Sequence, residues 1–422
     1  MVDPRVLEEV ERLRGEMVEA LVELIKIPAL SPDNGGEGEL RKAEKLEEII
    51  RQWPFDRIER YDAPDPRALN GIRPNLLAYY YGEQGEQSPR LWILTHLDVV
   101  PPGDLEKWTE TSPFNPLLKE GKVYGRGSED NGQSLVASLY AVRALMNLGL
   151  RPKRTFVLAF VSDEETGNRY GIEWLMKNHP ELFRREDLVL VPDGGNREGT
   201  FIEIAEKSLL WLKVKVEGKQ VHGSTPHKGF NAFRVALDYA RVLDQRLHEK
   251  FDVEDELFEY PISSFEPTMG RSLSDAPNII PGEAEVVFDC RVLPCYRLDE
   301  ILHEAETLAR RLEGEYRREL GERTFPRIKL EVLQQVESPA TPSDSPIVKL
   351  LRRAIRELRG KEARVGGIGG GTFAAYFRRL GIPAAVWGTF DELAHQPNEY
   401  ARIDNLVEDA KVMAYLGLAA EI

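Results

Sequence analysis

Apolar residues along the chain form short continuous runs that are separated by segments with helical periodicity. Such runs are typical of buried strands, whereas apolar residues three and four positions apart predict helices over 5–26, 38–52 and 132–148. Strands that alternate with helices, and that lack a polar face, predict an α/β fold with a mostly parallel sheet covered by helices on both faces. The predicted strands are Asn75–Tyr81, Leu91–Leu94, Thr155–Val161, Leu188–Val191 and Ala384–Trp387.

The middle of the chain has a different pattern. Apolar and polar residues partly alternate over 210–216, as expected for a half-exposed strand. A helix, two strands, a helix and a strand are predicted to follow, and this βαββαβ order is that of a ferredoxin-like α+β domain. A chain of 422 residues also suits two domains. We therefore expect an α/β domain built from residues 1–208 and 337–422, interrupted by an inserted domain at 209–336.

Composition limits the kinds of partner. The chain has 56 basic and 71 acidic residues, so its formal charge is −15, which disfavours nucleic acid or an anionic membrane as the main partner. No apolar run approaches the length of a membrane span, and the first residues do not resemble a signal peptide. The two cysteines, Cys290 and Cys295, match no zinc or redox motif. These features predict a cytoplasmic protein.

The first candidate site follows the predicted strand Leu91–Leu94. His96 and Asp98 are two residues apart, so in an extended chain they point the same way. The carboxyl end of a strand is also where open α/β sheets keep their active sites. The pair therefore suits a metal-binding histidine with a nearby carboxylate, although a buried histidine bonded to an aspartate explains the same pattern.

Further acids and a histidine follow three other predicted strands. These are Asp163–Glu165, Asp193 and His395, and a glycine-rich loop at Gly125–Gly132 adds Asp130. Each alone has an ordinary explanation, such as an acidic turn or a helix cap. Together they form a set of nitrogen and carboxylate ligands without cysteine, which suits zinc, cobalt or manganese in an open catalytic site.

Several motifs in a fixed order extend over nearly the whole chain. In this order the chain resembles the dinuclear zinc metallopeptidase family of aminoacylase, glutamate carboxypeptidase, acetylornithine deacetylase and succinyl-diaminopimelate desuccinylase. The motifs are His96-x-Asp98, Trp108 with Pro113-Phe114, Gly125-Arg126-Gly127-x-x-Asp130, Asp163-Glu164-Glu165-Thr166-Gly167, Pro192-Asp193-Gly194, His222-Gly223-Ser224-x-Pro226 and His395.

The resemblance implies two divalent metal ions, most readily Zn²⁺, with Co²⁺ or Mn²⁺ as alternatives. Asp130 would bridge the two ions. His96 and Asp193 would bind one ion, and Glu165 and His395 would bind the other.

The resemblance also implies catalytic roles. Glu164 would be the general base, which takes a proton from the attacking water and later passes it to the leaving amine. Asp98 would orient His96. The peptide bond between Asp130 and Asn131 would be cis, which is rare outside proline.

A histidine in the inserted domain, His222, would stabilise the oxyanion. In the family this histidine acts in the active site of a partner subunit, which implies a homodimer formed through the inserted lid and dimerisation domain. The sequence leaves open whether His222 acts in its own subunit or in its partner's.

Four positions are candidates for binding the substrate. Arg291 offers a planar cationic group, and Asn278 lies in the connection before that strand; both match family positions. The segment Gly366–Thr372 precedes a predicted helix, so Gly370 and Thr372 could face an anion. A surface ion pair is the alternative explanation for Arg291.

We therefore expect a two-metal amidohydrolase or exopeptidase. It would cleave an N-acyl amino acid of the succinyl-diaminopimelate or acetylornithine type, or a short peptide with a free carboxylate. A dipeptidase or carboxypeptidase of the same family is the alternative, and a two-metal phosphoesterase or a non-catalytic metal-binding protein are more remote. Phe373 stands where many relatives have aspartate, and residues 131–133 replace a lysine-glycine pair, so the substrate stays open.

Overall fold

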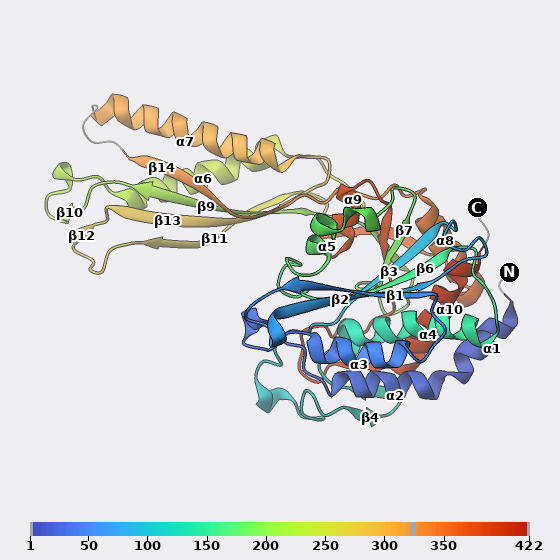
Figure 1. Cartoon of the computed structure of the whole chain (residues 1–422). Coiled ribbons are helices and arrows are strands. Elements are labelled where there is room, and N and C mark those ends of the chain that lie inside the picture. Colours follow the sequence, from blue (N-terminus) through green and yellow to red (C-terminus); the bar gives the residue numbers. More distant parts are fainter. Residues whose placement is uncertain (1–2, 321–325, 420–422) are drawn as a thin grey trace. The chain divides into compact units, whose positions relative to one another are not determined.

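The computed structural model describes residues 3–320 and 326–419. The chain folds into two compact units, which Figure 1 shows as ribbons. Unit 1 contains the chain up to Ile204, Thr341–Gly366 and the chain from Thr372 onward. Unit 2 contains Ala205–Ala340 and Gly367–Gly371. The sequence-based domain limits at 208/209 and 336/337 stay predictions.

Unit 1 is built around an eight-stranded sheet. Strands β6, β3, β7 and β16 lie side by side and parallel at its centre, whereas β2 and β8 run antiparallel to their neighbours β6 and β16. The predicted α/β fold with a mostly parallel sheet is confirmed. In sheet order the strands are β1 (Arg57–Pro64), β2 (Ile72–Tyr80), β6 (Thr155–Val161), β3 (Arg90–His96), β7 (Leu188–Val191), β16 (Ala384–Val386), β8 (Phe201–Glu206) and β15 (Arg364–Ile368).

Helices cover both faces of this sheet (Figure 1). One face packs against α5 and α9 in a core that includes Trp92 and Phe377. The other face packs against α3 and α4. With both faces covered, the central strands are buried along their whole length, which explains their continuous apolar runs. The helices are α1 (Pro4–Arg12), α2 (Arg14–Ile25), α3 (Leu40–Ile50), α4 (Ser134–Asn147), α5 (Ile172–Asn178), α8 (Pro346–Arg359), α9 (Ala374–Arg379) and α10 (Ile403–Leu418).

The helix predicted over 5–26 is two helices. The break falls at Leu13, whose N–H group lies within hydrogen-bond distance of the carbonyls of both Glu9 and Val10. Gly15 follows in the first turn of α2, and glycine weakens a helix interior because its backbone has more freedom to lose.

A small antiparallel sheet joins two loops of unit 1 that are far apart in the sequence. Its strands are β4 (Leu117–Lys119), β5 (Lys122–Tyr124) and β17 (Tyr400–Arg402), with β5 in the middle. Strand β5 leads into the loop of Asp130, and β17 follows the loop of His395. The sheet therefore places the start of the Asp130 loop beside the end of the His395 loop.

Unit 2 has the βαββαβ order of a ferredoxin-like domain. Its four-stranded antiparallel sheet has the order β11-β13-β9-β14, and both helices contribute to its apolar core. Strand β9 alternates between buried and more exposed side chains because only one sheet face is covered by the helices. The elements are β9 (Ser208–Glu217), α6 (Ala232–Lys250), β11 (Ser264–Ser272), β13 (Glu283–Val292), α7 (Leu298–Leu320) and β14 (Arg327–Val336).

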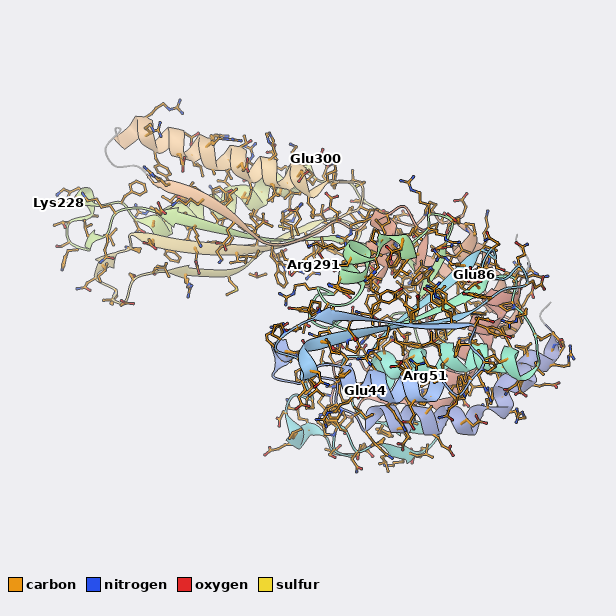
Figure 2. The ribbon with its side chains drawn as sticks, viewed as in Figure 1. Glu44, Arg51, Glu86, Lys228, Arg291 and Glu300 are labelled. Carbon is orange, nitrogen blue, oxygen red and sulfur yellow. The ribbon has the colours of Figure 1, made fainter. Side chains whose placement is uncertain are left out.

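Two short strands, β10 (Val221–His222) and β12 (Ile279–Ile280), pair beyond the end of this sheet. Figure 2 shows Lys228, just after β10, at one end of unit 2 and Arg291 of β13 toward the other. In the part of the chain that the structure describes, no helix has the length and apolar character to cross a membrane.

Candidate active site

Three parallel strands of unit 1 deliver candidate ligands to one edge of the sheet. His96 is the last residue of β3, Glu165 follows β6, and Asp193 follows β7. Because these strands are parallel neighbours, their carboxyl ends meet at the same edge. Two groups of side chains converge there, each with ligand atoms within 4.8 Å of one another. They are His96, Asp130 and Glu165, and His96, Glu164 and Asp193.

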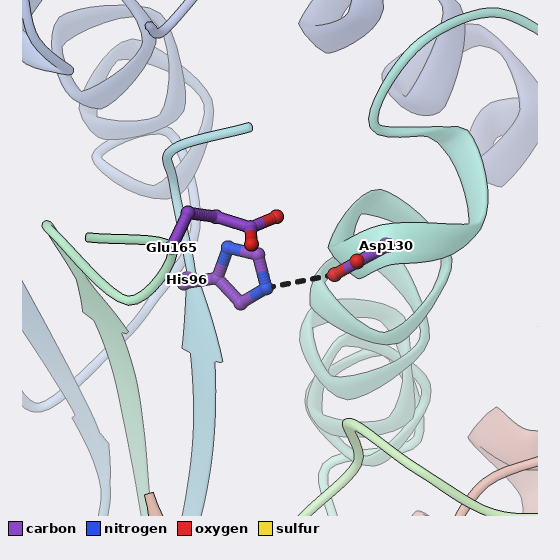
Figure 3. A group of neighbouring side chains, drawn as sticks. All are labelled: His96, Asp130 and Glu165. Atoms are coloured by element: carbon purple, nitrogen blue, oxygen red, sulfur yellow. Dashed lines mark hydrogen bonds and ion pairs between the residues drawn. The ribbon is translucent and has the colours of Figure 1, made fainter. Parts of the chain in front are cut away.

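Asp130 lies between the two candidate histidines. Its Oδ1 is 3.0 Å from His96 Nε2, and its Oδ2 is 3.2 Å from His395 Nε2. Figure 3 shows His96, Asp130 and Glu165, with the first contact dashed. The peptide bond between Asp130 and Asn131 is cis, as the resemblance implies. With one oxygen toward each histidine, the Asp130 carboxylate has the geometry of a bridging ligand.

His395 and Asp193 complete the two sides of the cluster. His395 Nε2 lies 3.1 Å from Glu165 Oε2. Asp193 Oδ1 lies 3.6 Å from His96 Nε2 and accepts a hydrogen bond of 2.7 Å from Asn131 Nδ2. The structure therefore brings together all five residues for which the sequence predicts metal binding.

Crowding of carboxylates at this edge shifts their pKa values. Burial and the Asp193 charge raise the pKa of Glu164 well above its ordinary value. Burial also raises the pKa of Glu165 to about 7. For Asp130, hydrogen bonds from His395 and His96 outweigh burial and lower the pKa. Like charges at such distances repel one another unless protons or cations compensate them.

The donor set fits divalent cations. Imidazole nitrogens and carboxylate oxygens are ligands that zinc, cobalt and manganese accept, and no thiolate takes part. Among the described residues, Glu165 Oε1 is buried and has no hydrogen-bond partner. Such an atom normally costs folding free energy, and a cation would compensate it.

The Asp98 carboxylate contacts the loop of the predicted base more closely than the His96 ring. His96 Nδ1 lies 2.9 Å from the Asp98 main-chain oxygen but 3.5 Å from Asp98 Oδ1. The carboxylate accepts hydrogen bonds of 3.1 Å and 3.0 Å from the N–H groups of Glu164 and Glu165. Its predicted role in orienting His96 stays a prediction, and holding the 164–165 backbone is a second role that sequence reasoning missed.

A buried ion network under the same loop was also outside the sequence prediction. The Arg73 side chain is fully buried and donates to Glu39, Asp65 and Asp163. Asp163 has a φ of 67° and directly precedes Glu164. Charge-assisted bonds therefore hold an unusual backbone conformation beside the predicted base. Four positions spread from 39 to 163 carry no local sequence signal for such a network.

The remaining candidates are divided between the units. Thr372 belongs to unit 1, where its Oγ1 accepts a hydrogen bond of 3.1 Å from the Ala374 N–H group. His222, Asn278, Arg291 and Gly370 belong to unit 2.

Within unit 2 these four candidates form two separate pairs. The Gly223 N–H group beside His222 donates to Asn278 O at 2.7 Å. Arg291 donates to Asp289 and, at 3.3 Å, to Gly369 O beside Gly370. Arg291 pairs with Leu209 near the start of β9, whereas β10 follows the end of β9 at Glu217. Eight strand residues at about 3.4 Å each separate the pairs by roughly 27 Å.

Comparison with known proteins identifies the family. Residues 92–418 match the model of peptidase family M20/M25/M40. The chain belongs to this family. An uncharacterized metallohydrolase of Methanocaldococcus jannaschii is 39% identical over 405 residues, which cover 94% of this chain and 97% of that relative. A succinyl-diaminopimelate desuccinylase of Alkalilimnicola ehrlichii is 26% identical, over 93% of this chain and 96% of the relative.

Solved structures share the fold of this chain. A tripeptidase of Staphylococcus aureus superposes with a TM-score of 0.71 at 20% identity, and covers 96% of this chain and 97% of its own. The family match confirms the resemblance seen in the sequence motifs. It also confirms the expected enzyme class, a metal-dependent hydrolase that acts on amide or peptide bonds.

Proposed function

We propose that this M20-family hydrolase uses two divalent metal ions to remove the acyl group from an N-acyl amino acid that carries a free carboxylate. Zn²⁺ is the preferred ion, with Co²⁺ or Mn²⁺ as alternatives. The observation that supports this most is the approach of Asp130 to both His96 and His395. A desuccinylase among the relatives supports a substrate of the succinyl-diaminopimelate type. A substrate of the acetylornithine type is the second candidate. Short peptides, cleaved as by a dipeptidase or carboxypeptidase, are the alternative within the family, and the tripeptidase fold supports them.

Each predicted ligand has a place in this proposal. His96 and Asp193 would hold one ion, Glu165 and His395 the other, and Asp130 both. Divalent cations at such a site supply Lewis-acid activation of water and of the scissile carbonyl. The buried, carboxylate-lined edge of the sheet concentrates this effect by limiting solvent.

Glu164 is suited to proton transfer. Its side chain lies within 4.8 Å of the ligand atoms of His96 and Asp193. Burial raises its pKa, so the carboxylate is a stronger base than a glutamate in water. In our proposal Glu164 takes a proton from the attacking water and delivers it to the departing nitrogen. Asp98 holds the Glu164 backbone through the 3.1 Å hydrogen bond and so orients the base.

The Arg291 group would bind the substrate carboxylate. Asp289 engages two of the Arg291 donors and Gly369 O a third, which fixes the plane of the guanidinium. Arginine has five N–H donors, so others stay available for an anion. The backbone around Gly370, and the Thr372 side chain, would contribute to the same recognition.

His222 would donate a hydrogen bond to the oxyanion. The Ser224 N–H group donates to His222 Nδ1 at 3.1 Å, and Ser224 Oγ lies 2.7 Å from the same nitrogen, which favours the tautomer with its proton on Nε2. We propose that Asn278 assists beside it. Because His222 and Arg291 lie at opposite ends of unit 2, one unit 2 does not bring both to one small substrate. We therefore propose a cytoplasmic homodimer, joined through unit 2, in which His222 serves the partner's active site.

The decisive experiment compares Glu164→Gln with Glu165→Gln. A panel of N-acyl amino acids and dipeptides is first screened with Zn²⁺, Co²⁺ and Mn²⁺ to find the best substrate. We expect Glu164→Gln to keep two ions per chain and to lose at least about 1000-fold in kcat. Glu165→Gln should lose one ion as well as activity. Glu44→Gln is the matched control, because Glu44 of α3, labelled in Figure 2, is exposed. Retained turnover in Glu164→Gln would reject the assignment of the base.

A further inference from the structure

The position of His395 needs an explanation that its own packing does not provide. Its side chain is 57% exposed, although Nε2 approaches both Asp130 and Glu165. His395 has a φ of 65°, and Glu392 and Asn398 on the same loop have similar values. Such conformations are uncommon for non-glycine residues and persist only where surrounding contacts impose them. Contacts to the backbone of this loop must therefore hold the ring in place.

Glu129 supplies part of these contacts from the loop of Asp130. Its side chain is buried, and its carboxylate reaches the other loop rather than the adjacent helix α4. Oε1 accepts a hydrogen bond of 2.6 Å from the Asp391 N–H group, and Oε2 accepts one of 2.5 Å from the Leu393 N–H group. Leu393 is two residues before His395, so these bonds fix the backbone that leads into the histidine.

Glu399 makes the reciprocal connection from the loop of His395. It is fully buried. Oε1 accepts hydrogen bonds from the N–H groups of Glu129 and Asp130, at 2.9 Å and 3.0 Å. Oε2 accepts one of 3.0 Å from the Gly127 N–H group. Each loop thus contributes one carboxylate, and the main-chain amides of the other loop bind it.

Arg126 provides the cation for this arrangement. Its Nη1 lies 2.7 Å from Glu399 Oε2, and its donors also face the main-chain oxygens of His395 and Gln396. Arg126 is itself buried, so the ion pair is shielded from solvent. A buried, charge-assisted connection of this kind is stronger and more rigid than one between neutral groups.

We propose that Glu129 and Glu399 are positioning residues of this active site, which tie the loop of Asp130 to the loop of His395 and so set the distance between these two side chains. The proposal rests on the metal-binding function proposed above. The Glu129–Glu399 pair does not touch substrate. It acts through Asp130, which would bind both ions, and through His395, which would bind only one, so the ion of His395 is affected more.

A positioning role and a general role in folding predict different effects on the two ions. Loosening the His395 loop weakens the ion that Glu165 and His395 would bind. The ion of His96 and Asp193 is affected less, because β3 and β7 hold its ligands directly. A merely structural role would lower the thermal stability without favouring one of two ions.

The test uses Glu129→Gln in the full-length protein. The amide nitrogen replaces one carboxylate oxygen and places a donor against a main-chain N–H group, while size and shape stay nearly the same. Chelator-treated protein is titrated calorimetrically with Zn²⁺, and thermal unfolding is followed by circular dichroism. We expect the ion of His96 and Asp193 to bind with nearly wild-type affinity, and the ion of Glu165 and His395 to bind at least tenfold more weakly than in the wild type. Glu392→Gln, exposed on the same loop, removes the same charge and should bind both ions normally.

Two further measurements complete the test. Glu129→Asp keeps the charge but is one methylene too short to reach both amides, so it should show the same loss. If neither variant folds, hydrogen exchange on wild-type protein decides: peptides covering 389–396 should exchange at least 100-fold more slowly than an unstructured loop. Normal binding of both ions by Glu129→Gln, or unprotected exchange, would overturn the proposal. Wild-type protein that binds no pair of ions would instead refute the proposed metal site.

Discussion

The Glu165 main-chain N–H group donates a hydrogen bond of 3.0 Å to the Asp98 carboxylate. The Glu164 N–H group donates to the other oxygen of the same carboxylate. Asp98 thus links the strand that ends in His96 to the loop that carries two acidic candidates. The sequence assigns Asp98 only to His96, whereas in the structure its carboxylate also contacts the backbone of Glu164 and Glu165.

From this relationship we expect Asp98→Asn to lower kcat by about 10- to 100-fold. The amide nitrogen would face a main-chain N–H group, so the 164–165 backbone would shift and Glu164 would lose its alignment. KM should change little, because we propose that Arg291, and not Asp98, binds the substrate carboxylate. Steady-state kinetics at constant metal saturation measure this. Asp62→Asn, an exposed control on β1, should leave kcat unchanged, and an equal loss in both variants would contradict the role.

Metal uptake should release protons. Hydrogen bonds to Asp130 and Glu165 raise the pKa of His395 to about 10, so the metal-free protein carries this proton at pH 7. A metal ligand must be neutral imidazole, so binding expels the proton, and the apparent affinity rises with pH as far as about pH 10. Calorimetry in two buffers of different ionisation enthalpy counts the protons. His395→Ala should release about one proton fewer than the wild type on metal binding. An equal number of released protons would contradict the assignment of His395 as a ligand.

A buried lysine predicts an unusual dependence of stability on pH. Lys42 of α3 lines a cavity of about 10 Å³ with His96 and Asp98, and burial lowers its pKa to about 8. Below pH 8 the folded state bears the full cost of the buried charge. Between pH 8 and the ordinary value of 10.5 the unfolded chain binds more protons, so stability rises with pH.

Lys42→Met should therefore stabilise the chelator-treated protein at pH 7, by up to about 3 kcal/mol. The difference from wild type should shrink as the pH rises toward 10.5. Urea unfolding at pH 7 and pH 9.5 measures both effects. Lys45 on the same helix is partly exposed and pairs with Glu48. Lys45→Met should therefore show neither the stabilisation at pH 7 nor its dependence on pH. If Lys42→Met is less stable than the wild type at pH 7, the charge of buried Lys42 must stabilise the folded state, which would contradict the prediction.

The proposed exchange of His222 between subunits can be tested by mixing two inactive variants. Glu164→Gln and His222→Ala are unfolded together and refolded to form mixed dimers. If His222 serves the partner's site, each mixed dimer contains one intact site, and activity recovers to about a quarter of wild type. If His222 serves its own site, no intact site forms and activity stays at background. Sedimentation velocity verifies that dimers are present.

The sequence predicted much of this site because its residues follow apolar strands. His96, Glu165 and Asp193 each lie within four residues of the end of such a run, and neighbouring parallel strands must bring their ends together. Glu129 had no such signal, since its partners lie 262 and 264 residues further along the chain. A glutamate before a helix has a simpler local explanation as a cap.

Parts of the fold were missed for related reasons. Helix α10 is buried on nearly all sides, so it lacks the polar face that reveals an amphipathic helix. Strand β1 is largely polar and partly exposed, because it lies at the edge of the sheet beside β2. In both α10 and β1, segments far away in the sequence determine which residues are buried. Local periodicity therefore does not predict either element.

The place of β16 in the central sheet has a consequence for synthesis of the protein. This strand, Ala384–Val386, lies between β7 and β8, both of which precede it by about 180 residues or more. A ribosome must therefore produce nine-tenths of the polypeptide before the gap between them can be filled. Until then the nascent chain presents two open, apolar strand edges, which are the surfaces that chaperones shield and that drive premature association.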